Sequence, residues 1–572
     1  MPARRLTSIS RRRFLTRAGY LGFGLAAWAA CGRGDDERPV STLDRTILQD
    51  VEGNLSHGPG EPYVVRTDLA QARADRERRR RTLVTFHHFS DFRILDEESP
   101  LRAEWADSCE PPLDVTSFRP QEVLSVQAAD ALIAAANALS ISPVTGQPAQ
   151  FAFHTGNATD NAQYNELRWF LDLMDGNPVY PDSGAIGYQG VQRESPSEAY
   201  ADLLQQGQRN FAPIGLSYPW YAVAGNRDML AQGSVPPSSR DQRYVAGAQK
   251  IMTLGPDALA EACAAPELLM GPGATATVFN DPETVIRGVG SDANRRLLSR
   301  HEWLTLHFAT SSTPGPEGHG FPPEFVDAGR AYYVLDRGPV TFIVLDTVNP
   351  AGPASGSIGL AQYQWLEGEL VARSGAYVDA AGQAVVTENE DRLIVIVSHH
   401  PVEAMTNQFS GPGSEQRFRG DEVEALLHRF PNVLLHIAGH TLEQRINSRP
   451  DPRGGERGYW QITTGSPLDA PMQGRLIDIV DNGDGTISVF STVYDSAAPI
   501  NPGDAKDPTP DDGTNERLLA GIARQLAAND AQLDLDAGGL TASDRNAEML
   551  LNAPFDLATL PTPTTQARPP DI

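Results

Sequence analysis

Five short apolar segments, each ending in a polar loop, constrain what this chain can fold into. Continuous apolar runs of this length are typical of strands that are buried on both faces, as in parallel sheets. Residues 119–139 and 165–174 lie between these runs and carry apolar side chains at helical spacing. The chain is therefore predicted to be an α/β protein. The five segments are TLVTFHHFSD (82–91), FAFHTGN (151–157), WYAVAGNRD (220–228), LIVIVSHHP (393–401) and VLLHIAGHT (433–441).

Patterns along the rest of the chain predict its organisation. Residues 331–347 and 474–493 are each expected to form a β-hairpin, because two β-rich runs flank a glycine-containing turn. We expect one domain over residues 82–500, in which 232–330, rich in Gly, Pro and Ser, is a loop-rich insertion near the site. Residues 32–81 are expected to form an N-terminal arm whose basic run, RADRERRRR, is a solvated helix face. Residues 501–572 are expected to be a linker, one helix (516–529) and a polar tail.

The first 31 residues predict an export signal. SRRRFL, Ser10 to Leu15, is a twin-arginine pattern, and the apolar stretch after it (18–30) is too short to span a bilayer. Cys31 follows small residues and is a candidate lipidation site, although Trp28 stands where an aliphatic residue is expected. We therefore expect export by the twin-arginine route to the periplasm or the cell exterior. Membrane contact is expected only through the signal peptide or a lipid anchor at Cys31.

The charge and cysteine content narrow the classes of partner. The formal net charge of −26 disfavours nucleic acid and anionic membrane surfaces as partners. An anionic substrate would therefore need a local positive site. Cys109 and Cys263 remain after the signal segment, and a disulfide between them is permitted outside the cytoplasm without being determined by the sequence.

Polar residues at the ends of the five segments predict a common site. Ligands of open α/β sheets bind beyond the carboxyl ends of the strands, and all five segments place a polar side chain there. Carboxylate, amide and imidazole ligands together suit Zn, Mn or Fe. The candidate ligands are Asp91, Asn157, Asn226, His399 (or its neighbour His400) and His440.

The order of these motifs (SD, TGN-x-x-D, GN-x-D, SHHP and GHT) resembles the calcineurin-like metallophosphoesterase superfamily. More narrowly, it is similar to a bacterial subgroup exported by the twin-arginine route. The likeness covers about residues 83–500 and includes DEESP (96–100), NELRWF (165–170), FIVLDTVNP (342–350) and GYWQITT (458–464). The resemblance implies a four-layer αββα sandwich of two mixed β-sheets with long loop insertions. It also implies phosphoester hydrolysis by two metal ions that an aspartate bridges.

The chain departs from the ligand pattern of that superfamily at four positions. Arg93 stands where the resemblance places a histidine ligand, and Asn157 stands where it places the bridging aspartate. Arg227 replaces the histidine that assists catalysis, and Leu442 replaces the last histidine ligand. Among the first-metal ligands only Asp91 is retained. At about 4 Å and an effective dielectric near 20, Arg93 would repel a dication by about 4 kcal/mol per unit charge. We therefore expect no first metal.

The second-metal position keeps more of its ligands, namely Asn157, Asn226, His399 and His440. These four donors are all neutral, so the charge of a bound dication would be uncompensated. The expected cofactor content is therefore either no metal or one weakly held divalent ion, Zn, Mn or Fe.

Arg93 and Arg227 are expected to replace part of the lost metal charge, because guanidinium groups bind phosphate or carboxylate through two hydrogen bonds. The sequence thus predicts an exported metallophosphoesterase-like protein that binds a phosphorylated or other anionic small molecule with little or no turnover.

Two alternative functions stay open. One is an active phosphoesterase with a single metal, and the other is a structural or partner-binding pseudoenzyme. In the latter, the two arginines would pair only with Asp91, Asp96 or Asp160.

Overall fold

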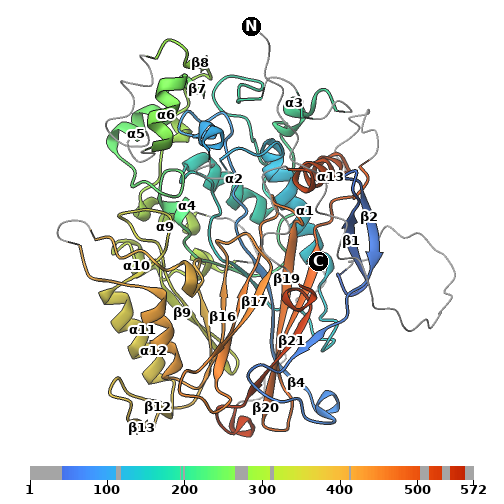
Figure 1. Cartoon of the computed structure of the whole chain (residues 1–572), viewed down its shortest axis with the longest axis vertical. Helices are drawn as coiled ribbons and strands as arrows, with labels where there is room; N and C mark the ends of the chain where they lie inside the picture. The colour runs from blue at the N-terminus through green and yellow to red at the C-terminus, as the bar shows by residue number, and fades with distance from the viewer. Residues whose placement is uncertain are drawn as a thin grey trace, which may run out of the picture. The chain divides into compact units, whose positions relative to one another are not determined.

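Two large β-sheets pack face to face, and helices cover their outer faces (Figure 1). The computed structural model describes residues 41–110, 117–192, 195–196, 200–264, 281–309, 315–410, 414–502, 514–530 and 541–560. The 7-stranded sheet has the order β3-β21-β20-β19-β4-β5-β6, and the 6-stranded sheet has the order β17-β18-β16-β14-β10-β9. The strands of the first sheet are β3 (Val64–Arg66), β4 (Arg81–Phe89), β5 (Ala152–His154), β6 (Trp220–Ala222), β19 (Gln473–Asp481), β20 (Thr486–Asp495) and β21 (Ala547–Asn552). Those of the second are β9 (Tyr333–Arg337), β10 (Val340–Val344), β14 (Leu393–Val397), β16 (Val433–Ala438), β17 (Arg445–Pro450) and β18 (Gly458–Thr463).

Both sheets are mixed, as expected. Strands β4, β5 and β6 pair in parallel, and so do β10, β14, β16 and β18. The five apolar segments correspond to β4, β5, β6, β14 and β16, whose residues are buried except for the first two of β4. Both predicted hairpins are also confirmed, as β9–β10 and β19–β20.

The remaining elements are short or lie outside the two large sheets. The helices are α1 (Ser125–Ala138), α2 (Tyr164–Asp175), α3 (Leu203–Gly207), α4 (Asn226–Met229), α5 (Ser239–Val245), α6 (Pro256–Ala264), α9 (Arg300–Phe308), α10 (Pro323–Val326), α11 (Leu360–Ala372), α12 (Gly420–His428) and α13 (Thr514–Ala528). Four two-stranded ribbons join β1 (Arg45–Gln49) to β2 (Leu55–Pro59), β7 (Gln249–Thr253) to β8 (Val285–Gly288), β11 (Ile358–Gly359) to β15 (Arg417–Phe418), and β12 (Ala376–Val378) to β13 (Ala384–Val386). The short 3-10 helices are η1 (Arg76–Arg78), η2 (Glu104–Ser108), η3 (Glu122–Leu124), η4 (Ala293–Arg295), η5 (Glu317–Gly320), η6 (Val402–Ala404), η7 (Ala542–Asp544) and η8 (Leu557–Thr559).

Alternating side chains of the strands produce the four layers. Phe342 of β10 faces the other sheet, where its ring lies 5.3 Å from that of Phe86 on β4. Its neighbour Ile343 points the opposite way and packs with Leu366 of α11 and Leu427 of α12. Because successive residues of a strand face opposite sides, one apolar strand serves both cores. Helix α1 contacts β19 and β20 on the other sheet, which completes the αββα arrangement.

Two segments outside residues 82–500 also join the 7-stranded sheet, which the expectation of an N-terminal arm and a polar tail did not include. Strand β21 pairs with β20, and β3 pairs in parallel with β21. The basic run forms the short helix η1, which has no buried residue, as expected, but Arg76 and Arg80 also bind Glu548 of β21 at 2.8 and 2.7 Å. These partners are about 470 residues apart along the chain, so no local pattern could show them. The predicted helix after the linker is confirmed as α13.

The segment 232–330, which was expected to be a loop-rich insertion, contains α5, α6, α9, α10 and the β7–β8 ribbon among its described residues. Ser238 accepts the N–H of Asp241 at the start of α5, and Ser299 accepts that of Glu302 at the start of α9. Both are capping boxes, a motif that marks the start of a helix and can be recognised in the sequence. A disulfide between Cys109 and Cys263 ties α6 to the segment after η2.

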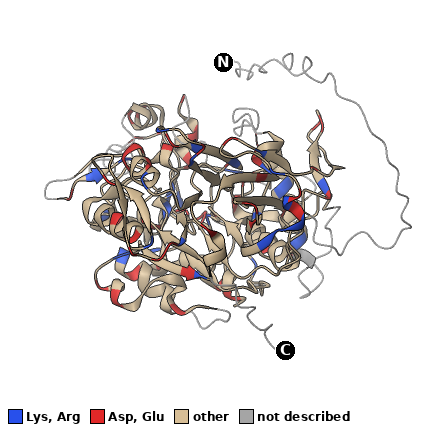
Figure 2. Ribbon diagram, turned by 90° about the horizontal axis from the view of Figure 1, so that it is seen from below, with Lys and Arg blue, Asp and Glu red and all other residues tan. Residues whose placement is uncertain are grey.

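The twin-arginine segment and Cys31 lie outside the described residues. Within the described part of the chain, no helix has the length and apolar character needed to cross a membrane. Figure 2 shows acidic and basic residues interspersed over the ribbon.

We predict that Phe342→Ala lowers the free energy of unfolding by about 3–5 kcal/mol, because it opens a cavity in the core that the two sheets share. Phe342 is fully buried, whereas Phe409 is 59% exposed. Phe409→Ala is therefore the control and should change stability by less than about 0.5 kcal/mol. Urea unfolding followed by tryptophan fluorescence measures both. Equal midpoints for the two variants would contradict the shared core.

Candidate functional site

The five predicted side chains come together where their strands end. Asp91 follows β4, Asn157 follows β5, Asn226 begins α4 after β6, His399 follows β14, and His440 follows β16. Contacts of 2.8–3.3 Å join them in a continuous set. The backbone turns sharply to aim them inward, with φ values of 53° at Asp91, 55° at Asn157 and 69° at His440. Left-handed backbone is uncommon outside glycine and is concentrated at functional sites.

Gly439 allows the loops of the two sheets to meet. A Cβ atom at this position would lie 1.7 Å from the hydroxyl oxygen of Ser90, in the loop that carries Asp91. Only glycine fits such a close approach. The backbone N–H of His440 can therefore reach the Asp91 carboxylate, to which it donates at 2.8 Å.

Asn157 closes the part of the site next to Asp91. Its amide oxygen accepts the backbone N–H of Arg227 at 2.8 Å, and this fixes the orientation of the amide. The amide nitrogen therefore faces Asp91 and donates to Oδ1 at 2.9 Å. The other Asp91 oxygen accepts from Ser90 Oγ at 2.7 Å as well as from His440. Asn157 thus presents an N–H, rather than a lone pair, at the place where the resemblance predicts a bridging carboxylate.

Arg93 adds positive charge beside Asp91. Its Nε lies 3.8 Å from Asp91 Oδ1, and the side chain is buried. Burial, together with the positive charges of Arg227 and Arg119, lowers the pKa of Arg93 to about 10, so the group stays charged at neutral pH. Leu442, the fourth position of the expected first-metal site, is half-buried and has no donor atom in its side chain.

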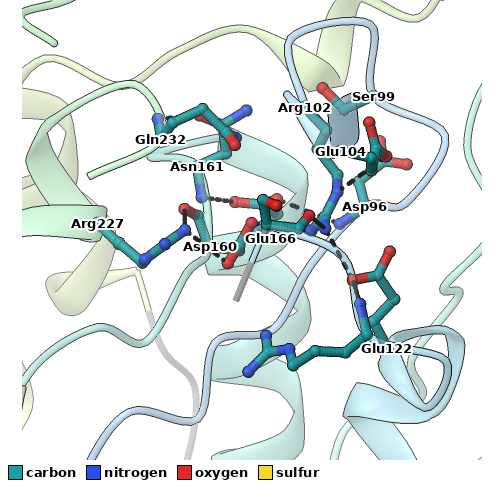
Figure 3. A network of polar contacts seen from close by, with 12 residues as sticks. Asp96, Ser99, Arg102, Glu104, Glu122, Asp160, Asn161, Glu166, Arg227 and Gln232 are labelled. Carbon is teal, nitrogen blue, oxygen red and sulfur yellow. Dashed lines mark hydrogen bonds and ion pairs between the residues drawn. The ribbon is translucent and has the colours of Figure 1, made fainter. Parts of the chain in front are cut away.

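Arg227 is ion-paired in the interior (Figure 3). Its Nη1 donates to Asp160 Oδ1 at 3.0 Å, and the other oxygen of Asp160 binds Arg102 at 2.9 Å. Burial acts to raise the pKa of Asp160, but the surrounding arginines, Arg227 first, outweigh it and lower the pKa. The structure therefore contains the pairings of Arg227 with Asp160 and Arg93 with Asp91. Asp96, the third carboxylate considered, binds Arg295 instead, at 3.1 Å.

His399 Nε2 and Asn226 Oδ1 each direct a lone pair at the other. His399 Nδ1 lies 2.7 Å from the carbonyl oxygen of Thr155, so Nδ1 carries the ring proton. Burial, with a further contribution from His400, holds the pKa of His399 well below its usual value, so Nε2 is unprotonated near neutral pH. The Asn226 nitrogen donates to the Gly233 carbonyl, which turns Asn226 Oδ1 toward His399 Nε2 at 2.9 Å.

Two acceptors at this distance repel unless a cation lies between them. His440 Nδ1 is 3.3 Å from the same His399 nitrogen and supplies a third donor atom. Burial also lowers the pKa of His440 well below its usual value, so its ring is neutral and able to bind a metal. Asn226, His399 and His440 therefore fit one divalent ion that prefers nitrogen and oxygen ligands.

His400 belongs to the same histidine group but has both ring nitrogens occupied. Among the described residues, His399, His400 and His440 form a group whose potential ligand atoms lie within 4.8 Å of one another. Yet the Thr347 hydroxyl lies 2.7 Å from His400 Nδ1, and His400 Nε2 lies 2.8 Å from the Ala354 carbonyl. Because that carbonyl requires a donor, Nε2 carries the proton and Nδ1 accepts from Thr347. His399, rather than His400, therefore has a ring nitrogen available for a metal.

Several buried polar residues that support the site were not identified from the sequence. Asp228 accepts the backbone N–H groups of Asn157, Gly225 and Thr159 at 2.8–3.0 Å and so fixes the two loops after β5 and β6. Arg102 joins Asp160 to Glu122. The last residue of the GN-x-D motif is Asp228, so the sequence did offer a pattern that includes this residue. No local pattern distinguishes a buried arginine such as Arg102 from a solvated one.

Comparison with known proteins gives little further information. No protein-family model and no curated protein matches the chain. Among solved structures, the chain is similar to the purple acid phosphatase PPD1 from yellow lupin (Lupinus luteus) seeds, with a TM-score of 0.28 and 12% sequence identity. The match covers 77% of this chain and 54% of the phosphatase, so the chain spans about half the length of that protein.

We predict that Asn157→Asp destabilises the metal-free protein at pH 8, because it replaces the hydrogen bond to Asp91 with a contact between two carboxylates. At about 4 Å and an effective dielectric near 20, the repulsion between the two carboxylates is on the order of 4 kcal/mol. Two adjacent carboxylates share a proton, which raises the pKa of the pair. The variant is therefore stable at low pH and loses stability as the pH rises through the pKa of the pair. Its stability should approach that of the wild type near pH 5.

Thermal melting at pH 5 and pH 8 measures this effect. Asn157→Ala is the matched control, because it removes the same hydrogen bonds without adding charge and should show a penalty that does not depend on pH. An Asn157→Asp protein that is as stable as the wild type at pH 8 without metal would contradict the orientation of the Asn157 amide.

Proposed function

We propose that this chain is an exported calcineurin-like metallophosphoesterase-type protein that binds a phosphate-like anion with little or no turnover. The observation that carries the proposal is the Asn157 amide, which donates to Asp91 and accepts from the Arg227 backbone. A bridging ligand must offer lone pairs to two metals, and an amide nitrogen has none to offer. Export rests on the SRRRFL motif at Ser10 to Leu15.

Anion binding is supported by the charge of the site. Arg93 and Arg227 are both buried. Burial, together with the charge of Arg227, lowers the pKa of Arg93 to about 10. Burial acts to raise the pKa of Asp160, but Arg227 and Arg93 help to lower it. Buried cations in one another's field are stabilised by an anion. A guanidinium group binds phosphate firmly but cannot generate hydroxide from water near neutral pH, which is the task of a metal in this chemistry.

A second candidate function is an active phosphoesterase with a single metal. The facing lone pairs of Asn226 and His399, with His440 beside them, support retention of one Zn, Mn or Fe ion. Such an ion would supply Lewis-acid polarisation of a phosphoryl oxygen. The ligand set holds no carboxylate, so we infer weak binding and place this function second. A structural or partner-binding pseudoenzyme is the third candidate and would bind neither metal nor anion.

We predict that the purified protein binds at most one equivalent of Zn²⁺ and that His399→Ala abolishes this binding. His400→Gln is the matched control and should retain the metal, because both nitrogens of His400 are already hydrogen-bonded. Metal content after dialysis measures both outcomes. A chromogenic phosphodiester should not be hydrolysed by the metal-loaded wild type. Clear turnover would overturn the preferred function in favour of the second candidate.

We predict that inorganic phosphate raises the Tm of the wild type and that Arg227→Ala greatly reduces this effect. A ligand at 100 times its Kd stabilises the folded state by about 2.7 kcal/mol. Arg168→Ala is the control, because Arg168 pairs with Asp172 on the surface of α2 and should leave the phosphate effect unchanged. Sodium chloride at equal ionic strength corrects for screening. Equal protection in Arg227→Ala and the wild type would contradict the role of Arg227.

A further inference from the structure

Arg119 is a fully buried arginine just before η3, and one edge of its guanidinium has no partner among the described residues. Its Nη1 donates to both carboxylate oxygens of Asp469, at 2.9 and 3.0 Å. Its Nε and Nη2 atoms are buried, and no residue that the structure describes accepts a hydrogen bond from them. A buried N–H group without an acceptor is costly, so such a group calls for an explanation.

The unpartnered edge is the one that recognises oxyanions. Nε–H and Nη2–H lie in the guanidinium plane, point in the same direction and together hold two oxygens of a carboxylate or phosphate. Among the described residues, several other arginines have a buried Nε without a hydrogen-bond partner, but their Nη2 is not in this state. They are Arg80, Arg330, Arg419, Arg449, Arg475 and Arg524. Arg119 differs from these because two adjacent donors are available together.

Arg119 is held at the same end of the sheets as the candidate site. Asp469 lies in the loop after β18, which runs parallel to β16, so this loop and the loop of His440 leave the same edge of the sheet. Gly465 of the Asp469 loop packs against the carbonyl of Leu442, where an added Cβ would lie only 3.0 Å away. Asp469 therefore places Arg119 on the side of the site that Leu442 occupies.

A chain of contacts also connects Arg119 to Arg227. The backbone N–H of Arg119 donates to Glu122 at 3.0 Å, and the same carboxylate oxygen accepts from Arg102 at 2.8 Å. Arg102 in turn binds Asp160, the partner of Arg227 (Figure 3). The positive charge of Arg119 contributes to lowering the pKa values of both Arg93 and Asp160. Arg119 thus acts electrostatically on the same group of residues.

We propose that Arg119 is a specificity-determining residue of the anion site, where its Nε–Nη2 edge binds two oxygens of a terminal phosphate group. Asp469 holds the guanidinium in place through Nη1. The inference rests on the proposed anion site and narrows its ligand to a phosphomonoester. A terminal phosphate offers three unesterified oxygens, enough for Arg119 and for Arg93 or Arg227 together. A phosphodiester offers only two.

Isothermal titration of the full-length mature protein with inorganic phosphate and with dimethyl phosphate tests this assignment. The wild type should bind phosphate more tightly than dimethyl phosphate. Arg119→Lys keeps the charge but removes the two-donor edge, and it should weaken phosphate binding about tenfold or more. Arg524→Lys is the matched control, since Arg524 is also buried but binds Ser496 and Ala498 and should leave phosphate binding unchanged.

The possible outcomes separate this inference from the proposed function. Phosphate affinity in Arg119→Lys equal to that of the wild type would overturn the role of Arg119 and leave anion binding by Arg93 and Arg227 intact. A wild type that binds no phosphate would overturn both. If Arg119→Lys does not fold, Arg119→Met combined with Asp469→Leu removes the buried pair without leaving an unpaired charge. That double variant should show the same weakened binding, and unchanged affinity would again overturn the assignment.

Discussion

The side chain of Asn157 ties together the loops on which the site is built. Its oxygen accepts the Arg227 N–H in the loop after β6, and its nitrogen donates to Asp91 in the loop after β4. Asp91 in turn accepts the N–H of His440, which belongs to the other sheet. Hydrogen bonds through Asn157 and Asp91 therefore hold together the loops after β4, β5, β6 and β16.

The chemistry of the site follows from which atoms remain available. Around Asp91, both carboxylate oxygens are hydrogen-bonded, and Arg93 contributes a fixed positive charge. Around His399, by contrast, unprotonated nitrogen and amide oxygen face each other and favour a cation. One half of the site thus suits an anion and the other half suits a single metal. Guanidinium groups bind a phosphate but do not activate water, which supports binding with little or no turnover as the function.

The charged groups around the site are buried, so their ion pairs have a large effect on stability. Asp160 is shared by Arg102 and Arg227, and Glu122 is shared by Arg102 and the backbone of Arg119. Burial raises the pKa of Glu122 to about 7, even though Arg102 acts in the opposite direction. Removing one member of such a network leaves its partner charged in a medium of low dielectric, which costs more than the pair itself contributes. The arginines are therefore part of the internal structure as well as candidates for ligand binding.

The sequence by itself determined the central strands and the polar residues at their ends. A strand buried on both faces must be continuously apolar, and parallel strands bring their carboxyl ends to one edge, so both features are written locally. Only the tertiary structure decided that Arg76 and Arg80 bind Glu548, that β3 and β21 extend the sheet, and that Asn157 turns its nitrogen toward Asp91. It likewise decided that His399 rather than His400 keeps a free lone pair. These outcomes depend on partners hundreds of residues apart or on hydrogen bonds that fix one amide or one ring, and no local pattern records them.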